Sequence, residues 1–188
     1  MSTGMIVLAV VAVIVVVLVI WLIAAYNSFI GARNNVEESF STMDVYLKKR
    51  FDLVPNLVET VKGYASHERE TLSAVTQARS AVQSAGTTEE RMRGENMLTD
   101  SLRSLFAVSE AYPDLKANQN FLDLQQQLRR LEEDIANSRK YYNAVVKRFN
   151  NMCEMFPSNI IASIFHFERR PMFEVESAEE RNNVKVQF

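Results

Sequence analysis

Residues 5–25 read MIVLAVVAVIVVVLVIWLIAA, and all 21 of these residues are apolar. A helix of that length, at ~1.5 Å per residue, covers the ~30 Å hydrocarbon thickness of a bilayer. A soluble domain needs no apolar run of this kind. The sequence therefore predicts a transmembrane helix over residues 5–25, an external N-terminus over residues 1–4 and a water-soluble remainder.

The residues around the span predict whether it is cleaved and in which direction it crosses the membrane. Residues 1–4 carry no side-chain charge, whereas a secretory signal begins with a basic segment and has a shorter apolar core, so we expect no cleavage. No Lys or Arg precedes the span, while Arg33 and the basic triplet 48–50 follow it. The positive-inside rule then places the C-terminal domain in the cytoplasm and the N-terminus outside. Trp21 and Tyr26 fit the aromatic belt of the membrane interface.

The composition does not favour nucleic-acid binding or catalysis. With 21 basic and 23 acidic residues the net charge is −2, so no basic field favours nucleic acid as a partner. Cys153 is the only cysteine, which excludes an intramolecular disulfide and a Cys-rich metal site. His67 and His166 stand far apart without an H-E-x-x-H pattern, and the glycines are too scattered for a phosphate loop. An enzymatic hypothesis would need Cys153, His67 or His166. We expect no enzyme activity, metal or cofactor.

Helical spacing continues beyond the span. The apolar positions from Tyr26 to Leu47 keep a helical period without a Pro or Gly cluster, which predicts that the membrane helix extends into the cytoplasm as a stalk. Pro55 either kinks this helix or opens a new one. The segment 85–90, AGTTEE, is the clearest break, because a Gly stop precedes a Thr cap and two acids. The helix that follows is predicted to end near Tyr112, before Pro113.

The strongest periodic signal of the soluble part lies between residues 121 and 156. Apolar or small residues recur there at intervals of 3 and 4 in strict alternation, which predicts a long coiled-coil-like helix closed by Pro157. The positions are Phe121, Leu124, Leu128, Leu131, Ile135, Ser138, Tyr142, Val145, Phe149, Met152 and Phe156. Together with the short connections, this pattern predicts an all-α fold, in which residues 26–157 form an antiparallel bundle of three or four long helices.

The last segment, residues 158–188, differs in kind. An apolar run over 160–165 is followed by Arg169, Arg170 and Pro171, and the alternation of Val184, Val186 and Phe188 is typical of a strand. We expect a docking tail in extended form. The run around residues 159–167 has two interpretations: it covers the open end of the bundle, which we favour, or it forms an interfacial membrane contact.

Several motifs of this chain resemble the LemA family of bacterial membrane proteins. The resemblance covers nearly the whole chain and rests on residues 43–65 (MDVYLKKRFDLVPNLVETVKGYA), with shorter matches at 26–27 (YN), 33–34 (RN), 67–72 (HERETL), 112–118 (YPDLKAN) and 156–159 (FPSN). It implies a single-pass protein of the bacterial cytoplasmic (inner) membrane with a cytoplasmic helical bundle. It supplies no activity, because the family resembles a scaffold or assembly factor more than an enzyme. A magnetosome-associated branch of the family is tied to membrane remodelling, and no residue here indicates that branch.

The longest motif contains polar residues that would suit an interaction surface. They are Asp44, Lys48, Arg50, Asp52, Asn56, Glu59, Lys62 and His67. The alternative is that they cap helices and form salt bridges around Pro55.

We therefore expect a membrane-anchored scaffold that acts by self-association, as a homo-oligomer, or by recruiting an unidentified membrane or cytoplasmic protein. The alternative is a membrane-shaping or membrane-stress-related oligomer that organises the bilayer. In both hypotheses the lipid bilayer is a partner.

Overall fold

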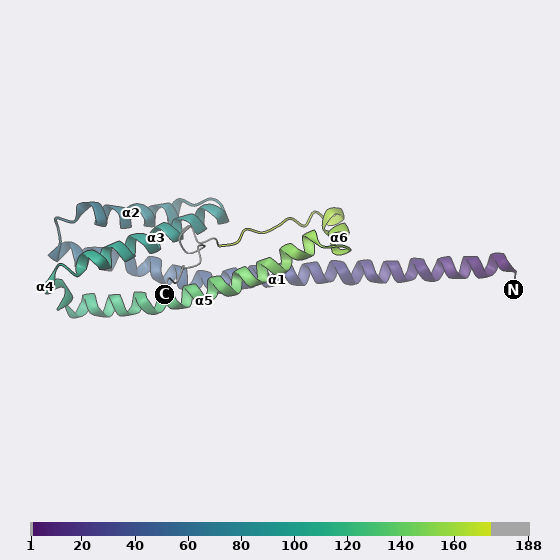
Figure 1. The fold of residues 1–188 in the computed structure, drawn as a ribbon, viewed down its shortest axis with the longest axis horizontal. Coiled ribbons are helices and arrows are strands. Elements are labelled where there is room, and N and C mark those ends of the chain that lie inside the picture. The colour runs from purple at the N-terminus through teal and green to yellow at the C-terminus, as the bar shows by residue number, and fades with distance from the viewer. Residues whose placement is uncertain (1, 174–188) are drawn as a thin grey trace, which may run out of the picture. The chain divides into compact units, whose positions relative to one another are not determined.

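The computed structural model describes residues 2–173 and contains helices and no strand within that range (Figure 1). The helices are α1 (Thr3–Tyr64), α2 (Arg69–Ser84), α3 (Thr88–Ser109), α4 (Pro113–Lys116), α5 (Gln119–Glu154) and α6 (Ser158–Phe165). The predicted all-α class is confirmed. The described part of the chain divides into two compact units, residues 2–40 with 141–172 (unit 1) and residues 41–140 with 173 (unit 2).

Helix α1 contains the predicted span and is long and apolar enough there to cross a membrane. The most apolar window has a mean hydropathy of 3.7, and none of it is buried against the protein. Since a water-exposed helix of valines would be unstable, lipid is the natural solvent for this part of α1. The helix is continuous to Tyr64, as the spacing after the span predicts.

Pro55 lies inside α1 and does not end it. A proline within a helix removes the hydrogen bond to the carbonyl four residues earlier, here that of Phe51. Arg79 of α2 compensates in part, because its Nε donates to the Phe51 carbonyl oxygen at 3.4 Å. The same guanidinium lies 4.0 Å from the centre of the Phe51 ring. Of the two sequence-based interpretations of Pro55, the one in which the helix continues is the observed one.

Unit 2 is a bundle built from the end of α1, from α2, α3 and α4, and from the start of α5. Its buried core is almost entirely aliphatic, as expected for amphipathic helices that turn one apolar face inward. The core residues are Val54, Leu57, Val61, Ala65, Val75, Ala78, Leu98, Leu102, Leu105, Leu115, Phe121 and Leu128.

The connections of unit 2 follow the sequence signals. Thr87 caps α3: its side chain accepts a hydrogen bond from the Glu90 backbone N–H, and the Glu90 carboxylate accepts one from the Thr87 N–H. This reciprocal capping box confirms the predicted break at residues 85–90. Helix α3 ends at Ser109, a few residues before the predicted end near Tyr112, and Pro113 occupies the first turn of α4.

Unit 1 contains the first part of α1, the last part of α5 and α6. The expectation of an extended tail from residue 158 differs from the structure over Ser158–Phe165, which form α6. Phe156 and Pro157 form the turn before this helix, and the apolar residues after Asn159 continue the helix, because Ile161 and Ala162 are buried on one side of it. Val184, Val186 and Phe188 lie outside the described residues.

Candidate functional site

Five of the eight predicted surface residues form an exposed row along one face of α1. Their spacing of three or four residues places them above one another on the helix. This polar stripe consists of Lys48, Asp52, Asn56, Glu59 and Lys62, all exposed. Lys48 pairs with Asp52 at 3.3 Å, and Lys62 lies 3.9 Å from Glu59, so the ion pairs of the stripe are local to the helix.

The other three predicted residues lie in different surroundings. Asp44 is partly buried and forms an ion pair with Arg91 of α3. His67 is exposed, as predicted, but it lies in the turn between α1 and α2 and not in a helix. Arg50 is fully buried, so its placement on an interaction surface is wrong.

Arg50 is the centre of a buried polar cluster in unit 2. Its Nη2 donates to the Glu95 carboxylate at 2.5 Å and to the Glu95 carbonyl oxygen at 3.1 Å. Its Nη1 donates to Thr99 at 2.6 Å and to the Glu132 carboxylate at 2.5 Å. The guanidinium fork therefore binds α1 to α3 and α5 at once, which a lysine could not do with the same geometry.

The charges of the cluster are balanced. The two carboxylates, Glu95 and Glu132, face the guanidinium groups of Arg50 and Arg139. Burial, reinforced by the nearby charge of Arg50, lowers the pKa of the Arg139 guanidinium from its usual range. The Glu95 side chain is 1% exposed and that of Arg50 is 0% exposed, so neither can meet an outside partner. The cluster therefore acts inside unit 2, where it joins α1 to α3 and α5.

The spacing of the apolar residues along α1 indicates that Arg50 is buried. Met43, Leu47, Val54 and Leu57 are buried at intervals that leave one position open, and Arg50 occupies it. Glu95 lies likewise among buried residues of α3. A charged residue at a core position of one helix requires an opposite charge at a core position of another.

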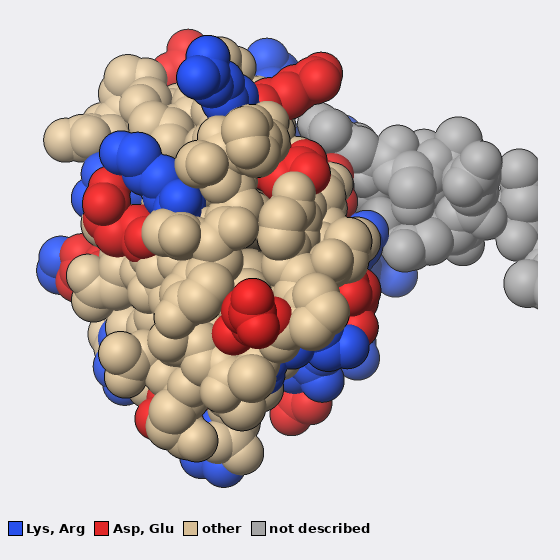
Figure 2. Space-filling model, turned by 90° about the vertical axis from the view of Figure 1, so that its left-hand side faces the viewer, with Lys and Arg blue, Asp and Glu red and all other residues tan. Residues whose placement is uncertain are grey.

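Three of the motifs, at residues 43–65, 67–72 and 112–118, meet at one end of unit 2. Tyr112 donates a hydrogen bond to Glu68 at 2.7 Å, which raises the pKa of the tyrosine hydroxyl, and Asn118 donates to the Tyr64 hydroxyl at 2.9 Å. Figure 2 views this end: on the described surface seen there, acidic and basic side chains are mixed, and neither sign gathers into a patch. These polar motif residues therefore hold the turn between α1 and α2 against the segments on either side of α4.

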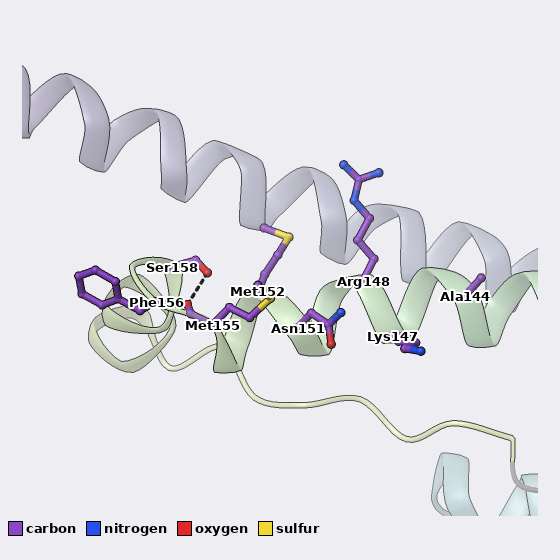
Figure 3. A pocket seen from close by; sticks show the side chains of 8 residues that line it. All are labelled: Ala144, Lys147, Arg148, Asn151, Met152, Met155, Phe156 and Ser158. Carbon is purple, nitrogen blue, oxygen red and sulfur yellow. Dashed lines mark hydrogen bonds between the residues drawn. The ribbon is translucent and has the colours of Figure 1, made fainter.

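An open groove lies in unit 1 where α5 passes into α6 (Figure 3). Its volume is about 470 Å³, and both apolar and cationic side chains line it: Ala144, Lys147, Arg148, Asn151, Met152, Met155, Phe156 and Ser158.

The residues that an enzymatic hypothesis would use are divided between the two units, with Cys153 and His166 in unit 1 and His67 in unit 2. Burial, with the charge of Glu154 as a smaller cause, raises the pKa of the Cys153 thiol and so lowers its reactivity. His166 lies after α6, and His67 belongs to unit 2. Within residues 2–173 no group of three or more His, Cys, Asp or Glu side chains is placed to hold a metal ion.

An apolar membrane helix continuous with a helical bundle defines the class of this molecule, a membrane-anchored helical-bundle protein. Residues 39–188 match the LemA family, and the chain belongs to that family. It is 26% identical over 165 residues to Protein LemA of Metamycoplasma hominis, covering 83% of this chain and 75% of that protein. It is 25% identical over 183 residues to Magnetosome protein MamQ 2 and to Magnetosome protein MamQ 1 of Paramagnetospirillum magneticum, covering 84% of this chain and 67% of each.

Proposed function

We propose that this protein is a scaffold that holds a protein-binding surface beside the bacterial inner membrane, and that it acts by positioning and not by bond chemistry. The observation that carries the proposal is the continuity of α1, which contains both the span and the polar stripe in one helix. A partner bound to the stripe is thereby tied to the membrane by the same element.

The polar stripe is the surface that we assign to the partner, whether a second copy of this chain or another protein. Its charges are paired only within α1 and each is more than half exposed, from 56% for Asp52 to 74% for Glu59. Exposed pairs of this kind contribute little to stability, about 0–1 kcal/mol. Their charges therefore remain available to an incoming surface, where the presence of both signs favours specificity.

Site-specific crosslinking tests the proposal. In a full-length Cys153→Ser background, Asn56→Cys places one thiol at the centre of the stripe. Asn137→Cys is the matched control, since Asn137 is an exposed asparagine of α5 in the same unit. We expect a short thiol crosslinker in native membranes to trap a dimer or a stoichiometric protein partner through Asn56→Cys and not through Asn137→Cys. Only monomer from both variants would refute the scaffold.

A second function, organisation of the bilayer by several copies, is favoured by the similarity to two magnetosome proteins. Electron microscopy of liposomes with the reconstituted protein separates the two functions. A bilayer organiser changes vesicle shape at high protein density, whereas a simple scaffold leaves it unchanged.

A further inference from the structure

The junction of α5 and α6 exposes large apolar side chains that the protein does not cover. Phe156 is 80% exposed, more than any other aromatic residue between positions 2 and 173, and Met155 is 61% exposed. Ile160 and Ile164, one helical turn apart on α6, are 44% and 55% exposed. Ile161 and Ala162 on the same helix are buried and hold it against unit 1, so α6 has one face inside and one apolar face outside.

Aromatic contacts place this surface at the end of the membrane span. Tyr26 is the first residue after the predicted span, and its ring lies 4.7 Å from that of Phe165 at the end of α6. The ring of Phe29 stacks on that of Phe167 at 4.7 Å with an angle of 10° between the planes. Figure 1 shows α6 beside the part of α1 that follows the span. The interfacial layer therefore begins where α6 ends.

The direction of α5 also places its C-terminal end at the membrane interface. Within unit 1 Tyr142 packs against Phe40 and Phe149 against Phe29, so the two helices run antiparallel and α5 approaches the span toward its end. Helix α5 continues for five residues beyond Phe149, about 7.5 Å at ~1.5 Å per helical residue, and Phe156 follows in the turn after it. The span ends four residues before Phe29, about 6 Å away by the same rise. Phe156 thus reaches the boundary between headgroups and hydrocarbon.

Charge in this segment also fits a lipid surface. Residues 141–172 contain four basic side chains and two acidic ones, a net charge of +2. Lys147 and Arg148 line the groove next to Phe156 (Figure 3), and both are exposed. Arg169 and Arg170 follow α6, where Arg169 also forms an ion pair with Glu154 at 3.0 Å. Cationic side chains beside bulky apolar ones are typical of segments that bind anionic headgroups.

We propose that the α5–α6 junction and α6 form a second membrane contact, in which Phe156, Ile160 and Ile164 enter the headgroup layer of the bilayer that α1 crosses. Neighbouring arginines and lysines then lie among anionic headgroups. The span alone fixes one point of unit 1 in the membrane, whereas two contacts also fix its tilt and rotation relative to the bilayer.

The test measures the depth of single probes in the full-length protein. In a Cys153→Ser background, Ile160→Cys carries a polarity-sensitive fluorophore, and the protein is reconstituted in liposomes of phosphatidylcholine with phosphatidylglycerol. The matched control is Tyr141→Cys, because Tyr141 is 62% exposed, aromatic and also in unit 1, but about three and a half turns before the end of α5.

Interfacial segments lie ~5–10 Å deep, so we expect blue-shifted emission from the Ile160 probe and quenching by lipids brominated near the headgroup, but not by aqueous iodide. The Tyr141 probe should show the reverse. Removing phosphatidylglycerol or adding salt should weaken the quenching of the Ile160 probe by lipid.

Two results would overturn the proposal. One is an Ile160 probe as accessible to iodide as the Tyr141 probe. The other is an Ile160 probe shielded from iodide but not quenched by brominated lipid, with self-quenching that rises with protein density. That second result would assign the surface to contacts between copies of this chain.

Discussion

At the scale of single residues, Arg50 shows how neighbours in one motif take opposite roles. Lys49 is exposed and lies 5.7 Å from the Tyr46 ring, whereas Arg50, the next residue, is buried and bound by two carboxylates. The helical period decides between them, since a step of one residue turns the side chain by 100°. A polar residue type alone therefore does not locate a surface.

Arg50→Met should destabilise unit 2 strongly, by about 3–5 kcal/mol, because it leaves the Glu95 carboxylate buried without its partner. Lys49→Met is the matched control and should change the free energy of unfolding by less than about 0.5 kcal/mol. The double variant Arg50→Met with Glu95→Met should be less destabilised than Arg50→Met alone, since apolar side chains can replace a buried ion pair at small cost. Urea unfolding followed by circular dichroism in mild detergent measures all three, and equal losses for Arg50→Met and Lys49→Met would contradict the assignment.

At the scale of elements, α2 and α3 approach closely at a glycine. A Cβ added at Gly94 of α3 would lie 3.0 Å from the Val82 backbone nitrogen and 3.2 Å from the Ala81 carbonyl carbon of α2. Backbone atoms cannot move aside singly, so a side chain here would push the whole helix. By contrast, a Cβ at Gly63 near the end of α1 would meet nothing within 4 Å.

The two glycines therefore predict opposite outcomes for the same substitution. Gly94→Ala should lower the free energy of unfolding by roughly 1–2 kcal/mol, because overpacking exceeds the gain in helix propensity. Gly63→Ala should raise it by roughly 0.5–1 kcal/mol, because alanine loses less backbone entropy in a helix. Thermal unfolding of the two variants beside the wild type gives the signs, and stabilisation by Gly94→Ala would mean that α2 and α3 are not held at this distance.

The apolar seam of α5 shows what spacing can and cannot predict. Phe121, Leu128, Leu131, Ile135 and Tyr142 are buried, as the alternation of 3 and 4 predicts. Further along, Phe149 is buried as predicted, but Val146 is buried in place of the predicted Val145. A straight helix has 3.6 residues per turn, so a strict 3.5-residue repeat drifts by ~20° per heptad, which lets a neighbouring position take the buried side. Phe156 lies in the turn after α5, outside the helix, and is exposed.

At the scale of the whole molecule, the span, the helical class and the break at residues 85–90 can be predicted from the sequence. The continuation of α1 through Pro55 is one of two alternatives that the sequence leaves open. These features depend on residues near one another in the chain. The Arg50 cluster and the contact between Tyr26 and Phe165 join residues far apart in the chain, and local spacing does not specify such pairs. The helix at Ser158–Phe165 was missed because its eight residues are too few for a clear period.

The orientation of the molecule decides which leaflet α6 would meet. The rule that predicts a cytoplasmic bundle counts Lys and Arg near the span, and acidic residues contribute little to it. The excess of Lys and Arg after the span therefore still counts, although Arg33 pairs with Glu37 at 3.9 Å and Arg50 is buried. A cytoplasmic leaflet carries a negative surface potential, which suits the basic residues beside α6.

Labelling with a membrane-impermeant maleimide tests this orientation. In the Cys153→Ser background, Ser2→Cys should react in intact spheroplasts, while Asn137→Cys should react only after the membrane is opened. The reverse pattern would place the bundle outside. It would also separate the basic residues at 169 and 170 from the cytoplasmic leaflet, so the dependence of the α6 contact on anionic lipid would then have to come from the outer leaflet.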